Sequence, residues 1–97
     1  MKAKRAPTSP GEILREEFLL PLAMTQKQLG DHMGVDIKVI NRIVNGRSAI
    51  TPVVALKLAS TFQTTPTFWL NAQNAVDLYK AEKEVTSLPK PVVGKSA

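Results

Sequence analysis

Apolar residues recur along the chain at intervals of three and four, the spacing that places them on one face of a helix. The first such segment begins with SPGE at 9–12, where an N-cap serine, a first-turn proline and a glutamate three residues after the cap form a capping box. Its inward face is predicted to consist of Ile13, Leu14, Phe18 and Leu19. Pro21 cannot continue the backbone hydrogen-bond pattern, so it ends this predicted helix.

Two short helices are predicted next. TQKQ at 25–28 is a second capping box, and the helix that it opens ends at Gly34. The inward residues of this helix are predicted to be Leu29, His32 and Met33. The following helix has Asp36 as its N-cap and ends at Asn45-Gly46. Its buried side is predicted to be Val39, Ile40, Ile43 and Val44.

Thr-Pro pairs at 51–52 and 65–66 each supply an N-cap and a first-turn proline to a further helix. The fourth helix is predicted to be central to the core, with the apolar residues Val53, Val54, Leu56, Leu58, Ala59 and Phe62. The fifth is the longest and carries Phe68, Trp69, Leu70, Ala72, Val76 and Tyr79. The aromatic start of this helix is interpreted as an anchor in the core, with a role in a dimer interface as the alternative.

The pattern predicts an all-α fold of five helices, and no segment has the signal of a β-hairpin. The chain divides into a basic N-terminal arm at 1–8, a helical domain at 9–84 and a C-terminal tail at 85–97. The tail contains two prolines and few core-forming residues. With 97 residues, the chain can form one core.

The third predicted helix has a polar face that contains no acidic residue. Lys38, Asn41, Arg42 and Asn45 follow the i, i+3, i+4, i+7 spacing, so they form one stripe opposite the apolar residues. Ile37, in the first turn, lies beside this stripe. An ordinary solvated helix face is the alternative interpretation.

Two short helices joined by Gly34-Val35-Asp36 form a helix-turn-helix, which allows the second helix to enter the major groove of DNA. In that groove Lys38 and Arg42 can bond O6 and N7 of guanine, and Asn41 can pair with N6 and N7 of adenine. An exposed isoleucine at position 37 fits against a thymine methyl group.

Residues on either side of the stripe are expected to bind phosphates. Gln26 and Lys27 lie in the first turn of the second helix, where free backbone N–H groups favour an anion. Arg47 follows the third helix directly. The predicted DNA-binding residues are therefore Gln26, Lys27, Ile37, Lys38, Asn41, Arg42, Asn45 and Arg47.

The distribution of charge favours a nucleic-acid partner. Thirteen Lys and Arg against eight Asp and Glu give a net charge of +5. Lys2, Lys4 and Arg5 contribute +3 within residues 1–9, and the four basic residues between 27 and 47 face only two acids. A surface polarised in this way attracts a polyanion. Ordinary charge variation in a soluble protein is the alternative.

Composition narrows the kinds of site and the cellular location that can be expected. The absence of cysteine excludes disulfides, Cys-based zinc sites and cysteine nucleophiles. This absence also suits a reducing compartment, so the protein is expected to be cytoplasmic. No stretch approaches the roughly 20 apolar residues of a membrane span, so it is not expected to be membrane-bound. The only histidine, His32, is interpreted as a half-buried structural residue without a matched acid pair, and no Gly-rich phosphate loop is present. Neither an enzyme nor a cofactor is predicted.

The segment TQKQLGDHMGVDIKVINRIVNGR at 25–47 resembles the phage-repressor, or Xre-type, helix-turn-helix, with Gln26 in its usual place. The flanks SPGEILREEFLLPLAMT and ITPVVALKLASTFQTTPTFWLNAQNAVDLYKAE narrow the resemblance to the HigA family of antitoxins. The similarity covers about residues 9 to 84. Two departures are Gly30, where alanine is usual, and Thr8-Ser9, where many members carry histidine.

This resemblance implies a phage-repressor-like domain that forms a homodimer and represses its own operon by binding double-stranded operator DNA. It also implies neutralisation of a HigB-type toxin protein, a small ribosome-dependent mRNA endonuclease. The DNA-reading surface carried over from the family is Gln26, Ile37, Lys38, Asn41, Arg42 and Asn45. The fifth helix and the tail are expected to form the dimer surface. The alternatives are a stand-alone Xre-type regulator without a toxin partner, and a protein-binding adaptor that uses the helix-turn-helix as a scaffold.

Overall fold

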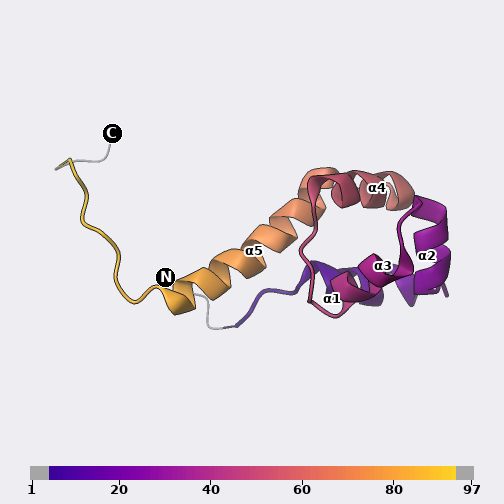
Figure 1. Ribbon diagram of the computed structural model, residues 1–97, viewed down its shortest axis with the longest axis horizontal. Helices are drawn as coiled ribbons and strands as arrows, with labels where there is room; N and C mark the ends of the chain where they lie inside the picture. Colours follow the sequence, from indigo (N-terminus) through magenta and orange to yellow (C-terminus); the bar gives the residue numbers. More distant parts are fainter. Residues whose placement is uncertain (1–4, 94–97) are drawn as a thin grey trace.

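A computed structural model describes residues 5–93 and contains five helices in sequence order (Figure 1). The first consists of α1 (Pro10–Ile13) and a π-helical continuation, η1 (Leu14–Leu19); the others are α2 (Gln26–Met33), α3 (Ile37–Val44), α4 (Pro52–Phe62) and α5 (Pro66–Glu84). No strand occurs between residues 5 and 93, and the predicted all-α, five-helix fold is confirmed. Lys2 and Lys4 of the basic arm lie outside the described residues.

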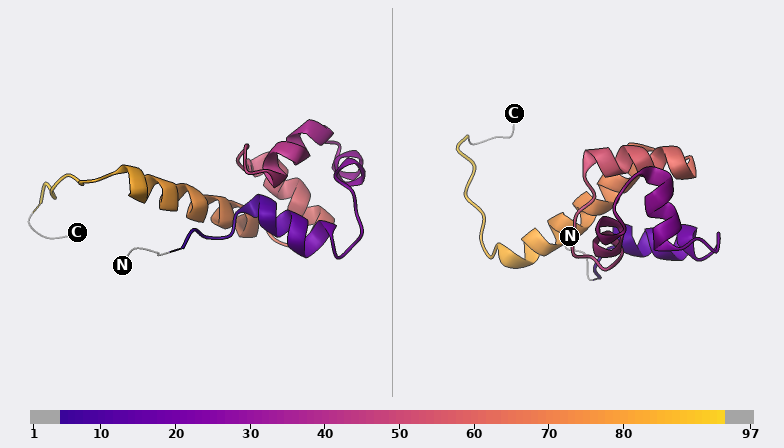
Figure 2. Two further views of the ribbon diagram at one scale, coloured as in Figure 1. Left: turned by 90° about the horizontal axis from the view of Figure 1, so that it is seen from below. Right: turned by 45° about the vertical axis from the view of Figure 1, so that its right-hand side comes forward.

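The helices are arranged as a body from which one helix projects. The elements α1 to α4 gather at one end of the molecule, whereas α5 begins beside α4 and extends away from them (Figures 1 and 2). The residues after α5 have no helical structure, and they turn away from the axis of the helix (Figure 2). All residues from 81 to 93 are exposed.

Side-chain caps fix the helix starts at the predicted positions. Thr25 and Gln28 form the complete capping box of α2, with distances of 3.0 and 2.9 Å between the bonded atoms. The Ser9 hydroxyl accepts a bond from the N–H of Glu12, which is one half of the predicted box. The N-caps of α3, α4 and α5 are Asp36, Thr51 and Thr65. These caps satisfy N–H groups that the helices themselves leave unpaired.

The first helix departs from the predicted α-helix in its second half. There the bonds span five residues, as in the 3.0 Å bond from the N–H of Leu20 to the carbonyl of Arg15. The wider turn is a π-helix. Pro21 lies in the turn that follows, so the predicted end of the helix is confirmed.

An aromatic cluster joins the first helix to α4 and α5. Trp69 is completely buried, and its indole N–H donates to the hydroxyl of Thr64 over 2.8 Å. The ring of Phe18 packs between Phe62 and Trp69, with centroids 4.7 and 5.4 Å away. The prediction that Trp69 anchors the core is confirmed. Phe68 packs edge-on against Trp69 but remains 40% exposed.

Three predicted core positions are wrong. Val53 and Leu56 are 61% and 60% exposed, because the inward face of α4 consists of Val54, Ala55, Leu58 and Ala59. His32 is exposed because the buried face of α2 runs through Leu29, Gly30 and Met33. In both α2 and α4, the buried face covers a smaller part of the helix surface than the sequence pattern predicts.

Two glycines allow backbones to approach closely. A Cβ atom at Gly11 would lie 1.9 Å from the carbonyl oxygen of Ile43, so α1 packs directly against the end of α3. A Cβ atom at Gly30 would lie 2.6 Å from the carbonyl oxygen of Val35, in the turn between α2 and α3. Both glycines therefore help to determine where α3 lies.

Replacing Gly11 with alanine is expected to lower the free energy of unfolding by about 1–3 kcal/mol or more, because α1 must move away from α3. Urea denaturation measures this effect. Gly46→Ala is the control, since its Cβ meets nothing within 4 Å and only the positive φ of 71° is unfavourable. A loss for Gly11→Ala no larger than for Gly46→Ala would contradict the close packing.

Candidate nucleic-acid interface

The turn between α2 and α3 is fixed by backbone geometry and hydrogen bonds. Gly34 ends α2 in the left-handed region at φ 68°, where a side chain is unfavourable. The N–H of Val35 then donates to the carbonyl of Gly30 over 2.8 Å. The carboxylate of Asp36 accepts from the N–H of Lys38 over 2.8 Å and starts α3. Two capped helices thus meet in a three-residue turn, which is a helix-turn-helix.

The two faces of α3 differ as the spacing predicts. Ile40 and Ile43 are 0% and 2% exposed and pack into the core. The opposite side is exposed and consists of Lys38, Asn41, Arg42 and Asn45. Ile37, at the first position of the helix, is 45% exposed although it is a large apolar residue.

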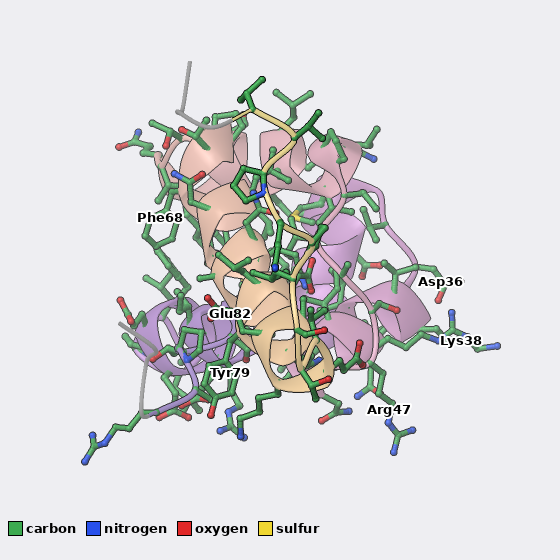
Figure 3. All side chains as sticks on the ribbon, turned by 90° about the vertical axis from the view of Figure 1, so that its left-hand side faces the viewer. Asp36, Lys38, Arg47, Phe68, Tyr79 and Glu82 are labelled. Carbon is green, nitrogen blue, oxygen red and sulfur yellow. The ribbon has the colours of Figure 1, made fainter. Side chains whose placement is uncertain are left out.

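A shallow hollow brings together six of the eight predicted residues. We call it the α3 hollow, and it is lined by Gln26, Ile37, Lys38, Asn41, Arg42 and Arg47. These residues come from the start of α2, from α3 and from the loop after α3. None of them is acidic. Lys38 and Arg47 extend outward on the same side of the molecule (Figure 3).

Three amide side chains are linked across this hollow. Asn45 donates through Nδ2 to Oδ1 of Asn41 over 3.2 Å, and Asn41 donates through Nδ2 to Oε1 of Gln26 over 3.1 Å. This chain holds Asn41 between two helices and fixes which way its amide faces. The NH₂ group of Gln26 remains available as a donor. Asn45 is thereby connected to the hollow, although it does not line it.

Lys27 occupies a different position from the other predicted residues. It lies in the first turn of α2, does not line the α3 hollow and forms an ion pair with Asp31 at 2.9 Å. Both side chains are largely exposed, at 73% and 70%, so the pair contributes little to stability. The ammonium group can therefore leave Asp31 for a stronger anion at small cost.

Sequence reasoning did not identify the contact that holds the loop after α3. Within α5, Nε2 of Gln73 donates to Oδ1 of Asp77 over 3.0 Å. Gln73 also accepts a bond from the N–H of Ile50 over 2.9 Å. These two residues are 23 positions apart, and no local pattern connects them.

Among residues 5–93, no group of three or more potential metal ligands lies together. No helix in this part of the chain has the length and apolar character needed to cross a bilayer.

Known proteins resemble the chain in both sequence and structure. A helix-turn-helix family model matches residues 14–69. Antitoxin HigA-1 of Vibrio cholerae is 47% identical over 78 residues, which cover 80% of this chain and 73% of that protein. An uncharacterized HTH-type transcriptional regulator of Haemophilus influenzae is 49% identical over 78 residues with the same coverage. The structure of antitoxin GraA in complex with its operator has a TM-score of 0.82 at 35% identity, covering 96% of this chain and 99% of that chain.

The fold, the turn geometry and these matches define an Xre-type helix-turn-helix protein. Within that class, the chain belongs to the HigA family of antitoxins. This family consists of DNA-binding regulators and antitoxins, which are not an enzyme class.

Proposed function

We propose that this protein represses its own operon by binding an operator as a homodimer, and that it neutralises a HigB-type toxin by direct binding. The observation that carries the DNA-binding proposal is the α3 hollow, where basic and amide side chains from three segments converge without an acid, all of them exposed except the half-buried Gln26. The solved complex of the related antitoxin GraA with its operator supports the same role.

In the proposed complex, α3 enters the major groove and its exposed side chains contact base edges. Lys38 and Arg42 donate to O6 and N7 of guanine, and Asn41 pairs with N6 and N7 of adenine. The hydrogen bond from Asn41 to Gln26 holds the asparagine in place before DNA arrives. Ile37 packs against a thymine methyl group, which accounts for a large apolar residue on a polar surface.

Phosphate contacts orient the protein on the duplex without reading the sequence. Gln26 and Lys27 occupy the first turn of α2, an eight-residue helix whose N-terminal N–H groups and dipole favour an anion. A phosphate near this terminus can take Lys27 from its exposed ion pair with Asp31. Arg47 reaches a neighbouring phosphate from the other end of α3.

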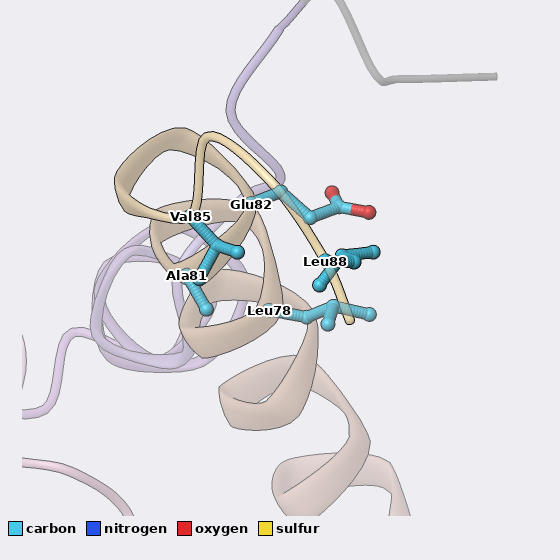
Figure 4. Close-up of a pocket in the computed structure, with 5 residues that line it drawn as sticks. All are labelled: Leu78, Ala81, Glu82, Val85 and Leu88. Atoms are coloured by element: carbon cyan, nitrogen blue, oxygen red, sulfur yellow. The ribbon is translucent and has the colours of Figure 1, made fainter. Parts of the chain in front are cut away.

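The projecting end of α5 is the proposed dimer surface. Together with the chain that follows, it forms an apolar groove lined by Leu78, Ala81, Glu82, Val85 and Leu88 (Figure 4). Leu78 and Leu88 are 62% and 79% exposed. A projecting helix end gains little stability by itself, because helices in proteins are stabilised mainly by packing. A second copy that packs on this groove supplies the missing contacts and gives a two-fold dimer.

A two-fold dimer requires an operator with inverted symmetry. Its recognition helices must enter successive major grooves, about 34–36 Å apart or at multiples of that distance. The operator is therefore expected to contain two half-sites in opposite orientation.

Replacing Arg42 with alanine is expected to weaken operator binding by about 1–3 kcal/mol and to relax the preference at one base pair of each half-site. Footprinting on the DNA upstream of the gene, at ~150 mM salt, measures both effects. The control is Arg15→Ala, which removes the same charge from the exposed surface of η1. Equal protection by wild type and Arg42→Ala would exclude the proposed base contact.

Replacing Leu78 with aspartate is expected to convert the dimer to a monomer, because two carboxylates would be buried in the groove. Light scattering at micromolar concentration measures the mass. Leu20→Asp is the matched control, since Leu20 is 63% exposed, close to the 62% of Leu78, but lies after η1. A wild-type monomer, or a dimer that survives Leu78→Asp, would rule out this interface.

The toxin partner separates the proposed function from its alternative, a stand-alone Xre-type regulator. The alternative is supported by the similar H. influenzae protein, which is named as a transcriptional regulator and not as an antitoxin. If the antitoxin role is correct, the tagged protein expressed from its own locus co-purifies with the product of an adjacent gene. That product cleaves mRNA when the antitoxin is removed. Operator binding without such a partner would favour the stand-alone regulator.

A further inference from the structure

Gln73 lies on the side of α5 that faces the loop between α3 and α4. Its Oε1 atom accepts from the N–H of Ile50, and its Nε2 atom donates to Oδ1 of Asp77. Among the side-chain hydrogen bonds of residues 5–93, the bond to Ile50 joins the residues farthest apart in sequence. It is also partly buried, so water replaces it poorly if it is lost.

The bond from Gln73 completes the attachment of the loop between α3 and α4. The N–H groups of Arg47 and Ser48 both donate to the carbonyl of Arg42, so the loop begins tied to α3. Ile50 is then tied to α5 through Gln73, and its side chain is 4% exposed. The loop that carries Arg47 is therefore attached at its start to α3, the proposed recognition helix, and at Ile50 to α5, the projecting helix.

Asp77 determines which way the Gln73 amide faces. A carboxylate accepts hydrogen bonds but does not donate them, so the NH₂ group of Gln73 must face Asp77. The amide oxygen is then directed at the N–H of Ile50. A reversed amide would place oxygen against carboxylate and NH₂ against N–H, which are both unfavourable contacts.

We propose that Gln73, oriented by Asp77, is a positioning residue that sets the spacing between the two operator half-sites. This inference rests on the proposed function. In a dimer joined through α5, the direction of α5 relative to α3 determines how far apart the two recognition helices lie. One base pair corresponds to about 3.4 Å along the duplex, so a small change in this direction alters the preferred spacing.

The test compares operators that differ only in the number of base pairs between half-sites. The full-length wild-type protein selects an operator from a randomised duplex library, and duplexes one base pair longer and shorter are then made. Fluorescence anisotropy gives the dissociation constant for each duplex. The readout is the spacing ratio, defined as the dissociation constant for an altered duplex divided by that for the selected one. Light scattering and thermal unfolding are recorded for each variant.

Four variants separate positioning from stability. Gln73→Met removes both hydrogen bonds, and Gln73→Glu keeps the acceptor for Ile50 but places two carboxylates together. The double variant Gln73→Glu/Asp77→Asn reverses the direction of the bond between the two positions and keeps the net charge of the wild type. Asp77→Ala removes only an exposed partner, so it remains informative if Gln73→Met fails to fold.

Gln73→Met, Gln73→Glu and Asp77→Ala are expected to lower the spacing ratio by about threefold to tenfold, the effect of one net hydrogen bond. The double variant is expected to restore it. Weaker binding at every spacing with an unchanged ratio would mean that Gln73 merely stabilises the fold, and would overturn the inference. If the wild-type protein selects no duplex, the proposed function is overturned together with this inference. If the wild-type protein shows a spacing preference and every variant keeps the same spacing ratio, this inference alone is overturned.

Discussion

The burial of Trp69 is the contact on which the arrangement of the other helices depends. Its indole ring lies at the start of α5, packs against Phe18 of η1 and donates a hydrogen bond to Thr64 in the loop between α4 and α5. One side chain thus connects α5 to η1 and to this loop. Aromatic pairs of this kind contribute about 0.5–1.5 kcal/mol each beyond the burial of their area. Only the first part of α5 is held in this way. The rest of the helix projects (Figure 1), and the polar side of α3 remains exposed.

Three attachments hold α3 in place, as the proposed recognition of bases would require. Asp36 caps its start, Gly11 of α1 packs against its last turn, and the loop after it is bonded to Gln73. Hydrogen bonds to bases depend on positions held within about half an ångström. The polar face can be exposed because the stability of α3 comes from its other side, where Ile40 and Ile43 are buried.

Much of this arrangement could be predicted from local sequence, and the reasons differ between elements. Helix starts are predictable because a cap such as Thr25 or Asp36 acts within two or three residues. The stripe on α3 follows from spacing alone, and the structure places it on the exposed side. The hollow that gathers residues of this stripe with Gln26 and Arg47 follows from the packing of α2 beside α3, which spacing along one helix does not specify.

The remaining features depend on contacts between distant segments. Val53 and Leu56 are apolar and therefore resemble core residues. They are exposed because the rest of the molecule covers only one side of α4. The π-helical turn of η1 has no sequence signal of its own, and the bond between Gln73 and Ile50 spans 23 residues. The contact of Gly11 with Ile43 is equally invisible without the packing of α1 on α3.

In the proposed dimer, the projecting end of α5 would also link the amount of protein to the state of the promoter. If two copies complete each other at this helix, the folded content of each chain rises with concentration, because association stabilises the structure that associates. At low concentration the number of dimers grows with the square of the number of chains, so repression responds more steeply than a monomeric repressor would. Association through the exposed residues 81–93 would then make repression depend on the number of copies in the cell.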